Sequence, residues 1–283
     1  MFGINRQVYY RKKHRKNKNS LTAEKVVEMV TQIRTRMPRI GTRKLYHLLH
    51  DPLQEMSVGR DRLFGILRAN QLMIYPKRSY RITTNTHHRF YKHKDLIHQL
   101  SINEPEQVGV ADITYLGSRG NHLYISLITD AYSKKIVGYD VSSNLDVTGV
   151  KTALQMANNN RIYPAKTLIH HSDKGLQYCA NEYQAMLNRY NMQCSMTENY
   201  DPYSNAVAER VNGIIKNEFN LESYQANMEQ MKTIMKETVA IYNNERPHFS
   251  CQLLTPNQMH KQNQIIMKTY KTKNRSQNVL TSV

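Results

Sequence analysis

Tryptophan is absent from the 283 residues, and cysteine occurs only at Cys179, Cys194 and Cys251. An odd number of widely spaced cysteines argues against a disulfide framework and against a zinc site of CxxC spacing. No apolar run approaches the roughly 18 residues of a membrane-spanning helix, and Met1–Ser20 lacks the apolar centre of a signal peptide. The sequence predicts a soluble cytoplasmic protein; a basic transit peptide is the alternative for the acid-free Met1–Ser20.

Acidic residues are scarce at the two ends of the chain. The net charge of +18 divides into +14 over residues 1–107, zero over residues 108–218 and +4 over residues 219–283. Basic segments on either side of a neutral one indicate polyanion-binding arms around a different kind of module. A generally basic, ribosome-associated protein is the alternative, and the neutral middle argues against it.

The first 75 residues predict a flexible basic arm, residues 1–20, and a small all-α domain, residues 21–75. Three short stretches of the domain have apolar residues at helical spacing, the first capped by Thr22 and the third by Ser57. The third stretch also carries cations on its outer side: Arg60, Arg62 and Arg68. This pattern is typical of a helix-turn-helix domain that binds DNA. A three-helix core with a solvated basic face is the alternative.

Residues 76–106 have little periodicity and predict a basic linker. Its cations alternate with aromatic rings, a mixture that suits contact with phosphates and unstacked bases, and those cations include Lys77, Arg78 and Arg81. Its four histidines have no cysteine beside them and are interpreted as solvated residues. At the other end of the chain, residues 261–283 carry five basic residues and no acid, which predicts a mobile basic tail.

Residues 107–260 have the pattern of a mixed α/β module. Three strand-like runs come first: Val108–Leu116, His122–Thr129 and Lys135–Val141. Alternating elements follow, namely helix Asp146–Asn158, strand Lys166–His171, helix Asn181–Tyr190, strand Met192–Met196 and helices Ser204–Asn220 and Met228–Tyr242. This order predicts an α/β ribonuclease-H-like core, with a mixed five-stranded sheet and flanking helices.

Three carboxylates stand where metal-dependent chemistry would need them. Asp112 lies in the middle of an apolar strand, where a carboxylate is costly unless it is paired or binds a metal. Asp173 follows the end of another strand, where sites of α/β sheets collect, and Glu209 lies on a helix 35 residues further along. Oxygen ligands alone favour Mg²⁺ or Mn²⁺ over zinc, and two such ions can catalyse in-line displacement at phosphorus.

Each carboxylate also has an ordinary interpretation. Asp173 alone suggests a turn residue and Glu209 alone a solvated helix residue, but the set of three in this element order favours a metal site. On the helix of Glu209, Asn212 and Lys216 follow at helical spacing, so one face can present a metal ligand and a phosphate-binding cation to the same DNA.

The motifs around these carboxylates resemble those of one family. They are Asp112-Ile113-Thr114-Tyr115, His171-Ser172-Asp173-Lys174-Gly175, Ser204-Asn205-Ala206-Val207-Ala208-Glu209 with Lys216, and Tyr242-Asn243-Asn244-Glu245-Arg246-Pro247-His248. The chain resembles the transposases of bacterial insertion sequences of family three, specifically the product of their second reading frame, which have a retroviral-integrase-like DDE core. The resemblance covers nearly the whole chain.

The resemblance implies that Asp112, Asp173 and Glu209 are the catalytic residues and hold two Mg²⁺ or Mn²⁺ ions. The implied activity is DNA strand cleavage followed by strand transfer from a freed 3′ hydroxyl, with no covalent enzyme intermediate. The implied partners are the terminal inverted repeats and the target DNA, other copies of the chain, and an upstream-frame product or fusion. The implied location of the protein is the bacterial cytoplasm, in association with the nucleoid.

Gly109 departs from the family pattern, which has tryptophan three positions before the first aspartate. The departure is either drift at a packing position or a weakened first strand. Two other functions therefore stay open at this point: a catalytically inert DNA-binding regulator of transposition with a degenerate core, and a nuclease acting on RNA–DNA hybrids. The predicted DNA-binding domain at residues 21–75 and the 35-residue spacing between Asp173 and Glu209 argue against the nuclease.

Overall fold

The computed structural model describes residues 5–75, 91–98, 100–118, 121–197, 205–224 and 226–262. A five-stranded mixed sheet forms its centre, in the order β3-β2-β1-β4-β5. The strands are β1 (Val108–Ser118), β2 (Asn121–Asp130), β3 (Ile136–Ser142), β4 (Leu168–Ser172) and β5 (Met192–Met196). The first three pair in antiparallel fashion, while β4 pairs in parallel with β1 and β5. The predicted ribonuclease-H-like sheet is confirmed.

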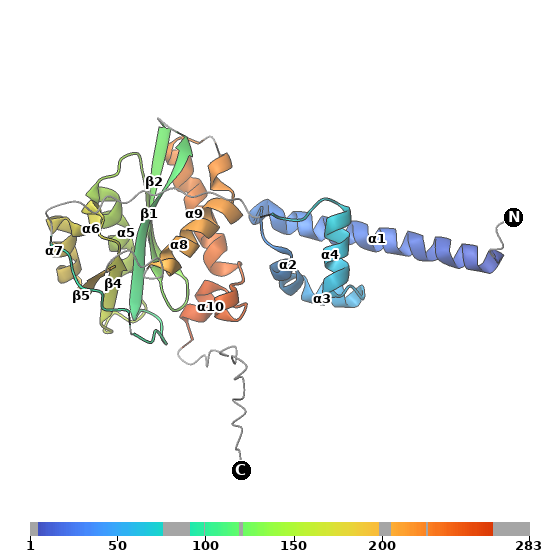
Figure 1. Cartoon of the computed structure of the whole chain (residues 1–283), viewed down its shortest axis with the longest axis horizontal. Helices are drawn as coiled ribbons and strands as arrows, with labels where there is room; N and C mark the ends of the chain where they lie inside the picture. The colour runs from blue at the N-terminus through green and yellow to red at the C-terminus, as the bar shows by residue number, and fades with distance from the viewer. Residues whose placement is uncertain are drawn as a thin grey trace, which may run out of the picture.

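Helices cover both faces of the sheet (Figure 1). On one face, α5 (Val147–Asn159) and α7 (Asn181–Arg189) pack on Ala111 and Ile128. On the other face, α8 (Ala206–Gly213) and α9 (Met228–Asn244) cover Leu116, Ile125 and Leu127. Because side chains alternate along a strand, the odd-numbered Ala111 faces one layer and the even-numbered Asp112 faces the other, toward α8.

The predicted single helix Ser204–Asn220 is wrong in one respect. α8 ends at Gly213, and a π-helical turn, Ile214–Glu218, follows it. Within this turn the backbone N–H of Phe219 donates to the carbonyl oxygen of Ile214 at 3.3 Å, a span of five residues. A π-helical turn accommodates an extra residue, so side chains beyond Gly213 leave the face that a regular helix would give them.

The N-terminal region is helical almost from its start, so the predicted flexible arm is wrong over the described residues. α1 runs without a break over Arg6–Arg36, and the side chain of Asn5 caps it by accepting from the backbone N–H of Gln7. Thr22 lies inside this helix rather than at its start. No glycine or proline interrupts residues 5–37, and Arg, Lys and Gln are good helix formers, so local propensity outweighs the repulsion between like charges.

Three shorter helices complete this region: α2 (Thr42–Leu48), α3 (His50–Glu55) and α4 (Arg60–Ala69). α3 was not predicted, and the predicted cap at Ser57 is wrong, because Gly59 is the N-cap of α4 and Ser57 has a positive φ of 54°. Of the residues predicted to face inward, Leu45, Leu63 and Leu67 are fully buried, but the prediction is wrong for Leu48, which is exposed. α1 packs on α4 through the buried Val26 and Val30.

A buried ionic junction joins the helical region to the sheet domain. The Glu218 carboxylate accepts from Lys44 Nζ of α2 at 2.9 Å and from Arg246 Nη2, beyond α9, at 2.8 Å. The carbonyl oxygen of Glu218 also accepts from the backbone N–H of Arg39 at 2.9 Å. Burial lowers the pKa of Lys44 to about 8, although Glu218 opposes that effect. Arg246 is only 2% exposed, so the junction is desolvated.

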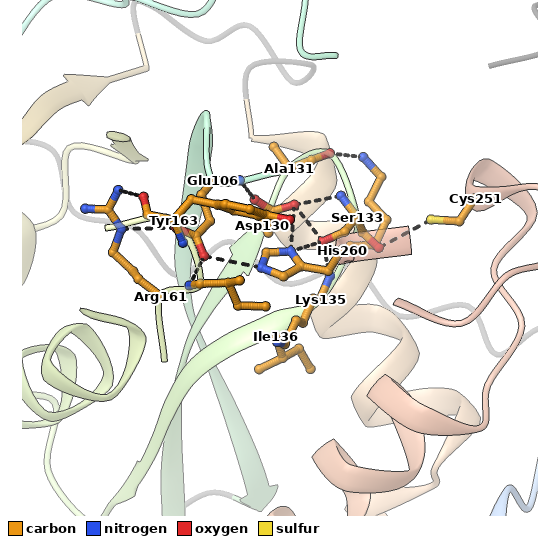
Figure 2. A network of polar contacts seen from close by, with 12 residues as sticks. Glu106, Asp130, Ala131, Ser133, Lys135, Ile136, Arg161, Tyr163, Cys251 and His260 are labelled. Atoms are coloured by element: carbon orange, nitrogen blue, oxygen red, sulfur yellow. Dashed lines mark hydrogen bonds and ion pairs between the residues drawn. The ribbon is translucent and has the colours of Figure 1, made fainter. Parts of the chain in front are cut away.

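A second buried network ties the end of the described chain to the sheet (Figure 2). His260, at the end of α10 (Pro256–His260), lies between two carboxylates, with its Nε2 3.5 Å from Glu106 Oε1 and its Nδ1 3.6 Å from Asp130 Oδ1. Ser133 Oγ lies 2.9 Å from Nδ1 and donates to Asp130. Arg161 Nε donates to Glu106 at 3.2 Å.

His260 makes the stability of this network depend on pH. Burial lowers the pKa of His260, but the bonds to Asp130 and Glu106 outweigh burial and raise it. A histidine whose folded-state pKa is raised contributes stability that is fully present below its unfolded pKa of about 6.5 and is lost as the pH rises through the folded value.

We therefore expect His260→Gln to destabilise the protein by roughly 2–4 kcal/mol near pH 6, because it removes the cation that Asp130 and Glu106 share and leaves Arg161 as the ion-pair partner of Glu106 alone. Near pH 9 the loss should be smaller. Urea unfolding at the two pH values measures both. The exposed His98→Gln is the matched control and should change neither value. An equal loss for His260→Gln at both pH values would contradict the charged state of this histidine.

Candidate active site

Asp112 lies on β1 at the centre of the candidate site, on the face covered by α8. Its Oδ2 accepts from Asn212 Nδ2 at 2.7 Å, and its Oδ1 accepts from the backbone N–H of Ile113 at 2.9 Å. Burial raises the pKa of Asp112 to about 7, and the negative charges of Asp173 and Glu209 add to this effect. Asp112 is therefore close enough to both other carboxylates to be repelled by them.

Asp173 directly follows β4, the parallel neighbour of β1. The pairing of the two strands ends at Val110 and His171, and Asp173 lies two residues beyond that pair, outside the strand. Its charge still acts on Asp112, so the two aspartates are near each other. The backbone N–H of Gly175 donates to Asp173 Oδ1 at 3.0 Å and holds that carboxylate in a turn.

Glu209 lies on α8, exposed, one turn before Asn212. Two asparagines fix this helix against β1: Asn212 through the carboxylate of Asp112, and Asn205 through a 3.2 Å bond from its Nδ2 to the carbonyl oxygen of Ala111. Both asparagines are buried. The sequence interpretation gave no role to Asn205, although it stands in the quoted motif of Glu209.

The carboxylates come from three elements but do not form a closed cluster. Over the residues that the structure describes, no three His, Cys, Asp or Glu side chains lie close enough together to hold a metal ion. Like charges repel, and one oxygen of Asp112 already accepts from Asn212. The donor chemistry nevertheless fits a hard divalent cation, because all three candidates supply carboxylate oxygens and Asp112 is a buried carboxyl whose charged form needs a counter-charge.

Lys216 and Asn212 do not share the arrangement predicted for them. Asn212 points into the protein at Asp112, whereas Lys216 lies in the π-helical turn. Lys216 Nζ is 3.4 Å from Glu222 Oε1 and 4.8 Å from the ring centre of Tyr115, and its side chain is 19% exposed. Neither partner was predicted. The π-helical turn changes the direction of the Lys216 side chain, and Tyr115 lies in the half of β1 that extends beyond its pairing with β4.

The other predicted DNA contacts are not gathered at the carboxylates. Arg60, Arg62 and Arg68 are exposed on α4, which belongs to the helical region (Figure 1). Arg60 pairs with Asp61 at 3.0 Å, and Arg62 Nη2 donates to Asn19 Oδ1 of α1 at 3.0 Å. The predicted linker contacts Lys77, Arg78 and Arg81 lie outside the described residues, as does the tail from residue 263.

Gly109 does not interrupt β1. It pairs with Asp130 on one side and with His170 on the other, within a strand of 11 residues. A Cβ atom added there would contact Ile128 Cγ2 at 3.7 Å, an ordinary packing distance. The strand that carries Asp112 is therefore intact, and the glycine is an unfilled packing position rather than a break.

Comparison with known proteins agrees with this architecture. Residues 102–202 and residues 181–256 match two models described as integrase core domain. An insertion element IS600 protein of 31 kDa from Shigella sonnei is 34% identical over 254 residues, which cover 88% of this chain and 92% of the relative. The transposase for insertion sequence element IS904 of Lactococcus lactis is 30% identical and covers 60% of this chain and 67% of the relative.

The chain is also similar to solved structures. One of them is the HTLV-2 integrase catalytic core domain in complex with magnesium, which is 18% identical in sequence with a TM-score of 0.43, and the match covers 56% of this chain and 97% of that one. No helix in the described part of the chain is long and apolar enough to span a membrane.

An integrase core with this strand order defines a class of protein, the polynucleotidyl transferases of the ribonuclease-H-like fold. Within that class, the chain belongs to the IS3 family of insertion-sequence transposases. The identification from motifs is confirmed, and an inert regulator of transposition is not favoured.

Because the pKa of Asp112 is raised in the folded state, its charge costs more stability as the pH rises from about 4 to about 7. Asp112→Asn removes that charge at nearly constant shape. We expect its stability advantage over the wild type to grow by up to roughly 3 kcal/mol between about pH 5 and about pH 8, without divalent cations. Chemical unfolding measures this gap. The exposed Asp61→Asn should show none, and a constant gap for Asp112→Asn would contradict the raised pKa of this buried carboxyl.

Proposed function

We propose that Asp112, Asp173 and Glu209 hold divalent cations and are the residues with which this transposase cleaves and joins DNA strands at the ends of its insertion element. The observation that carries the proposal is geometric: Asn212, one turn after Glu209 on α8, donates to the carboxylate of Asp112, and Asp173 directly follows the strand that pairs with β1. Divalent cations held there would activate the attacking oxygen and stabilise the leaving oxygen of a phosphodiester.

The chain's own residues orient these ligands. The Asn212 side chain donates to one oxygen of Asp112 and so fixes the rotation of that carboxylate. The backbone N–H of Gly175 does the same for Asp173. Asn205 and Asn212 together hold α8 on β1, so Glu209 is presented on a helix of fixed position. Buried asparagines with defined bonds support a site whose ligands are set in place before DNA arrives.

The helical region and the basic segments supply DNA binding in this proposal. The exposed arginines of α4, the linker cations and Lys216 are its proposed contacts with phosphates. Its proposed domain organisation has boundaries at residues 75, 106 and 260, while α1 runs through the boundary predicted at residue 20. Assembly of several copies on DNA, a partner from an upstream reading frame and association with the nucleoid stay predictions.

Replacing any one carboxylate should abolish cleavage and joining but leave DNA binding nearly unchanged. Asp112→Asn, Asp173→Asn and Glu209→Gln each remove one negative oxygen without adding bulk or touching the basic surfaces. Gel assays with Mg²⁺ or Mn²⁺ on duplexes carrying the element ends measure cleavage and joining, and a shift assay in EDTA measures binding. Glu237→Gln, an exposed carboxylate on α9, is the matched control. Near-normal joining by a variant would remove that residue from the site.

Lys216→Ala should have a milder effect than loss of a carboxylate, because a lysine acts on phosphate as a point charge. We expect weaker binding of element ends and reduced joining that partly recovers at high DNA concentration or low salt. Joining measured across DNA concentrations decides the question, with the exposed Lys236→Ala as control. Curves equal to the wild type would leave Lys216 as a lysine paired with Glu222, and a loss that no DNA concentration rescues would indicate a direct part in the chemical step.

A further inference from the structure

The N-terminal part of α1, Arg6–Lys18, stands apart from the other described elements, and Asn19 directly after it accepts from Arg62 of α4. Every side chain from Asn5 to Leu21 is exposed, on all sides of the helix. Figure 1 shows this end of α1 projecting away from α2, α3 and α4. Only from Val26 onward do its residues enter the core. Thirteen helical residues, Arg6–Lys18, form a projecting rod of about 20 Å.

The projecting part of α1 carries an uncompensated positive charge. It has seven cations and no acid: Arg6, Arg11, Lys12, Lys13, Arg15, Lys16 and Lys18. Within the described ranges, no ion pair joins any of them to a carboxylate. Cations four residues apart, such as Lys12 and Lys16, destabilise a helix. A partner that stabilises this segment should therefore be a polyanion.

The charges are not spread evenly around the helix. Four side chains that form hydrogen bonds without a fixed charge recur at intervals of three, four and three residues: Gln7, Tyr10, His14 and Asn17. At 100° per residue they share one strip about 80° wide. Pairs of cations border the strip on both sides, Arg6 with Lys13 and Arg11 with Lys18, while Lys12, Arg15 and Lys16 lie on the back.

We propose that Arg6–Lys18 of α1 lies in the major groove of duplex DNA, with the strip facing the base edges. This inference rests on the proposed DNA function and adds the element that reads sequence. The major groove, about 12 Å wide, admits one α-helix, and Asn and Gln side chains bind adenine through two hydrogen bonds. Cations on both borders then meet the phosphates of both strands, as in other basic helices.

The same geometry argues against two other partners. The major groove of an RNA duplex is too narrow and deep for side chains to read, so the strip has no use there. An oligomer formed through this helix would need an apolar seam, but the strip from Gln7 to Asn17 is made of polar side chains. Leu21 continues the direction of the strip one turn beyond Asn17 as a single aliphatic residue, and the exposed Val8 lies off it. Duplex DNA is the partner that uses both the strip and its borders.

Two matched double variants test the orientation of the helix. Lys13→Gln with Lys18→Gln removes one lysine from each border, and Lys12→Gln with Lys16→Gln removes two lysines from the back. With the full chain in EDTA, binding to duplex DNA is measured across salt concentrations. The border variant should lower the log–log salt slope by about 1.8, and the back variant by clearly less. Equal effects would overturn the proposal, because a helix held only by overall charge would not distinguish them.

Sequence reading is tested by selection from a library of randomised duplexes. The wild-type chain should enrich a motif of which roughly four or five adjacent base pairs depend on the strip, since Gln7 to Asn17 spans about 15 Å. Gln7→Ala with Asn17→Ala should lose that part of the motif and bind the selected duplex about tenfold more weakly, with the salt slope unchanged. Circular dichroism confirms that each variant keeps its helix.

The outcomes separate this inference from the proposed function. An unchanged motif in the Gln7/Asn17 variant overturns the reading role, even if cleavage by the wild type is normal. Equal affinity of the wild type for duplex RNA of the same sequence overturns the placement of the helix in the major groove of DNA. If the double variants sediment differently from the wild type but bind DNA equally well, the helix serves self-association instead. Loss of cleavage in the carboxylate variants bears only on the active site, because every binding measurement here is made without divalent cations.

Discussion

Glu218 is the residue on which the arrangement of the whole molecule depends. Its side chain binds Lys44 of the helical region and Arg246 beyond α9, and its backbone binds Arg39. Such a junction contributes little net stability when complete, because desolvation offsets attraction, but removal of one partner leaves a buried charge and is strongly destabilising. Its effect is thus to select one relative position of three segments.

That position has a consequence for the active site. Glu218 ends the π-helical turn that begins directly after α8, the helix of Glu209 and Asn212. The apolar residues around the junction belong to one continuous cluster, which contains Leu45 of the helical region, Phe219 after the turn and Val239 of α9. The helical region is therefore packed on the same layer that covers Asp112. If the helical region binds DNA as proposed, the bound DNA has a defined direction relative to the three carboxylates.

Much of the sheet domain could be predicted from sequence because its signals are local. Strand periodicity gave β1 to β5 within about two residues, and Asp112 stood out as a charge among apolar strand residues. The prediction was wrong where a local signal has two meanings. The cations of residues 6–18 suggested a flexible arm, yet the uninterrupted helix formers of the same segment produce α1. Partners such as Arg246 for Glu218, or Tyr115 for Lys216, lie far away in the sequence, and no periodicity reveals them.

The network around His260 makes the protein sensitive to premature termination during synthesis. Glu106 and Asp130 leave the ribosome early and enter the core beside β1 and β2, but the imidazole between them arrives about 130 residues after Asp130. A chain that stops before His260 already contains Asp112, Asp173 and Glu209, yet it must bury two carboxylates without their shared cation. Incomplete translation products of this transposase should therefore be short-lived rather than free to act on DNA.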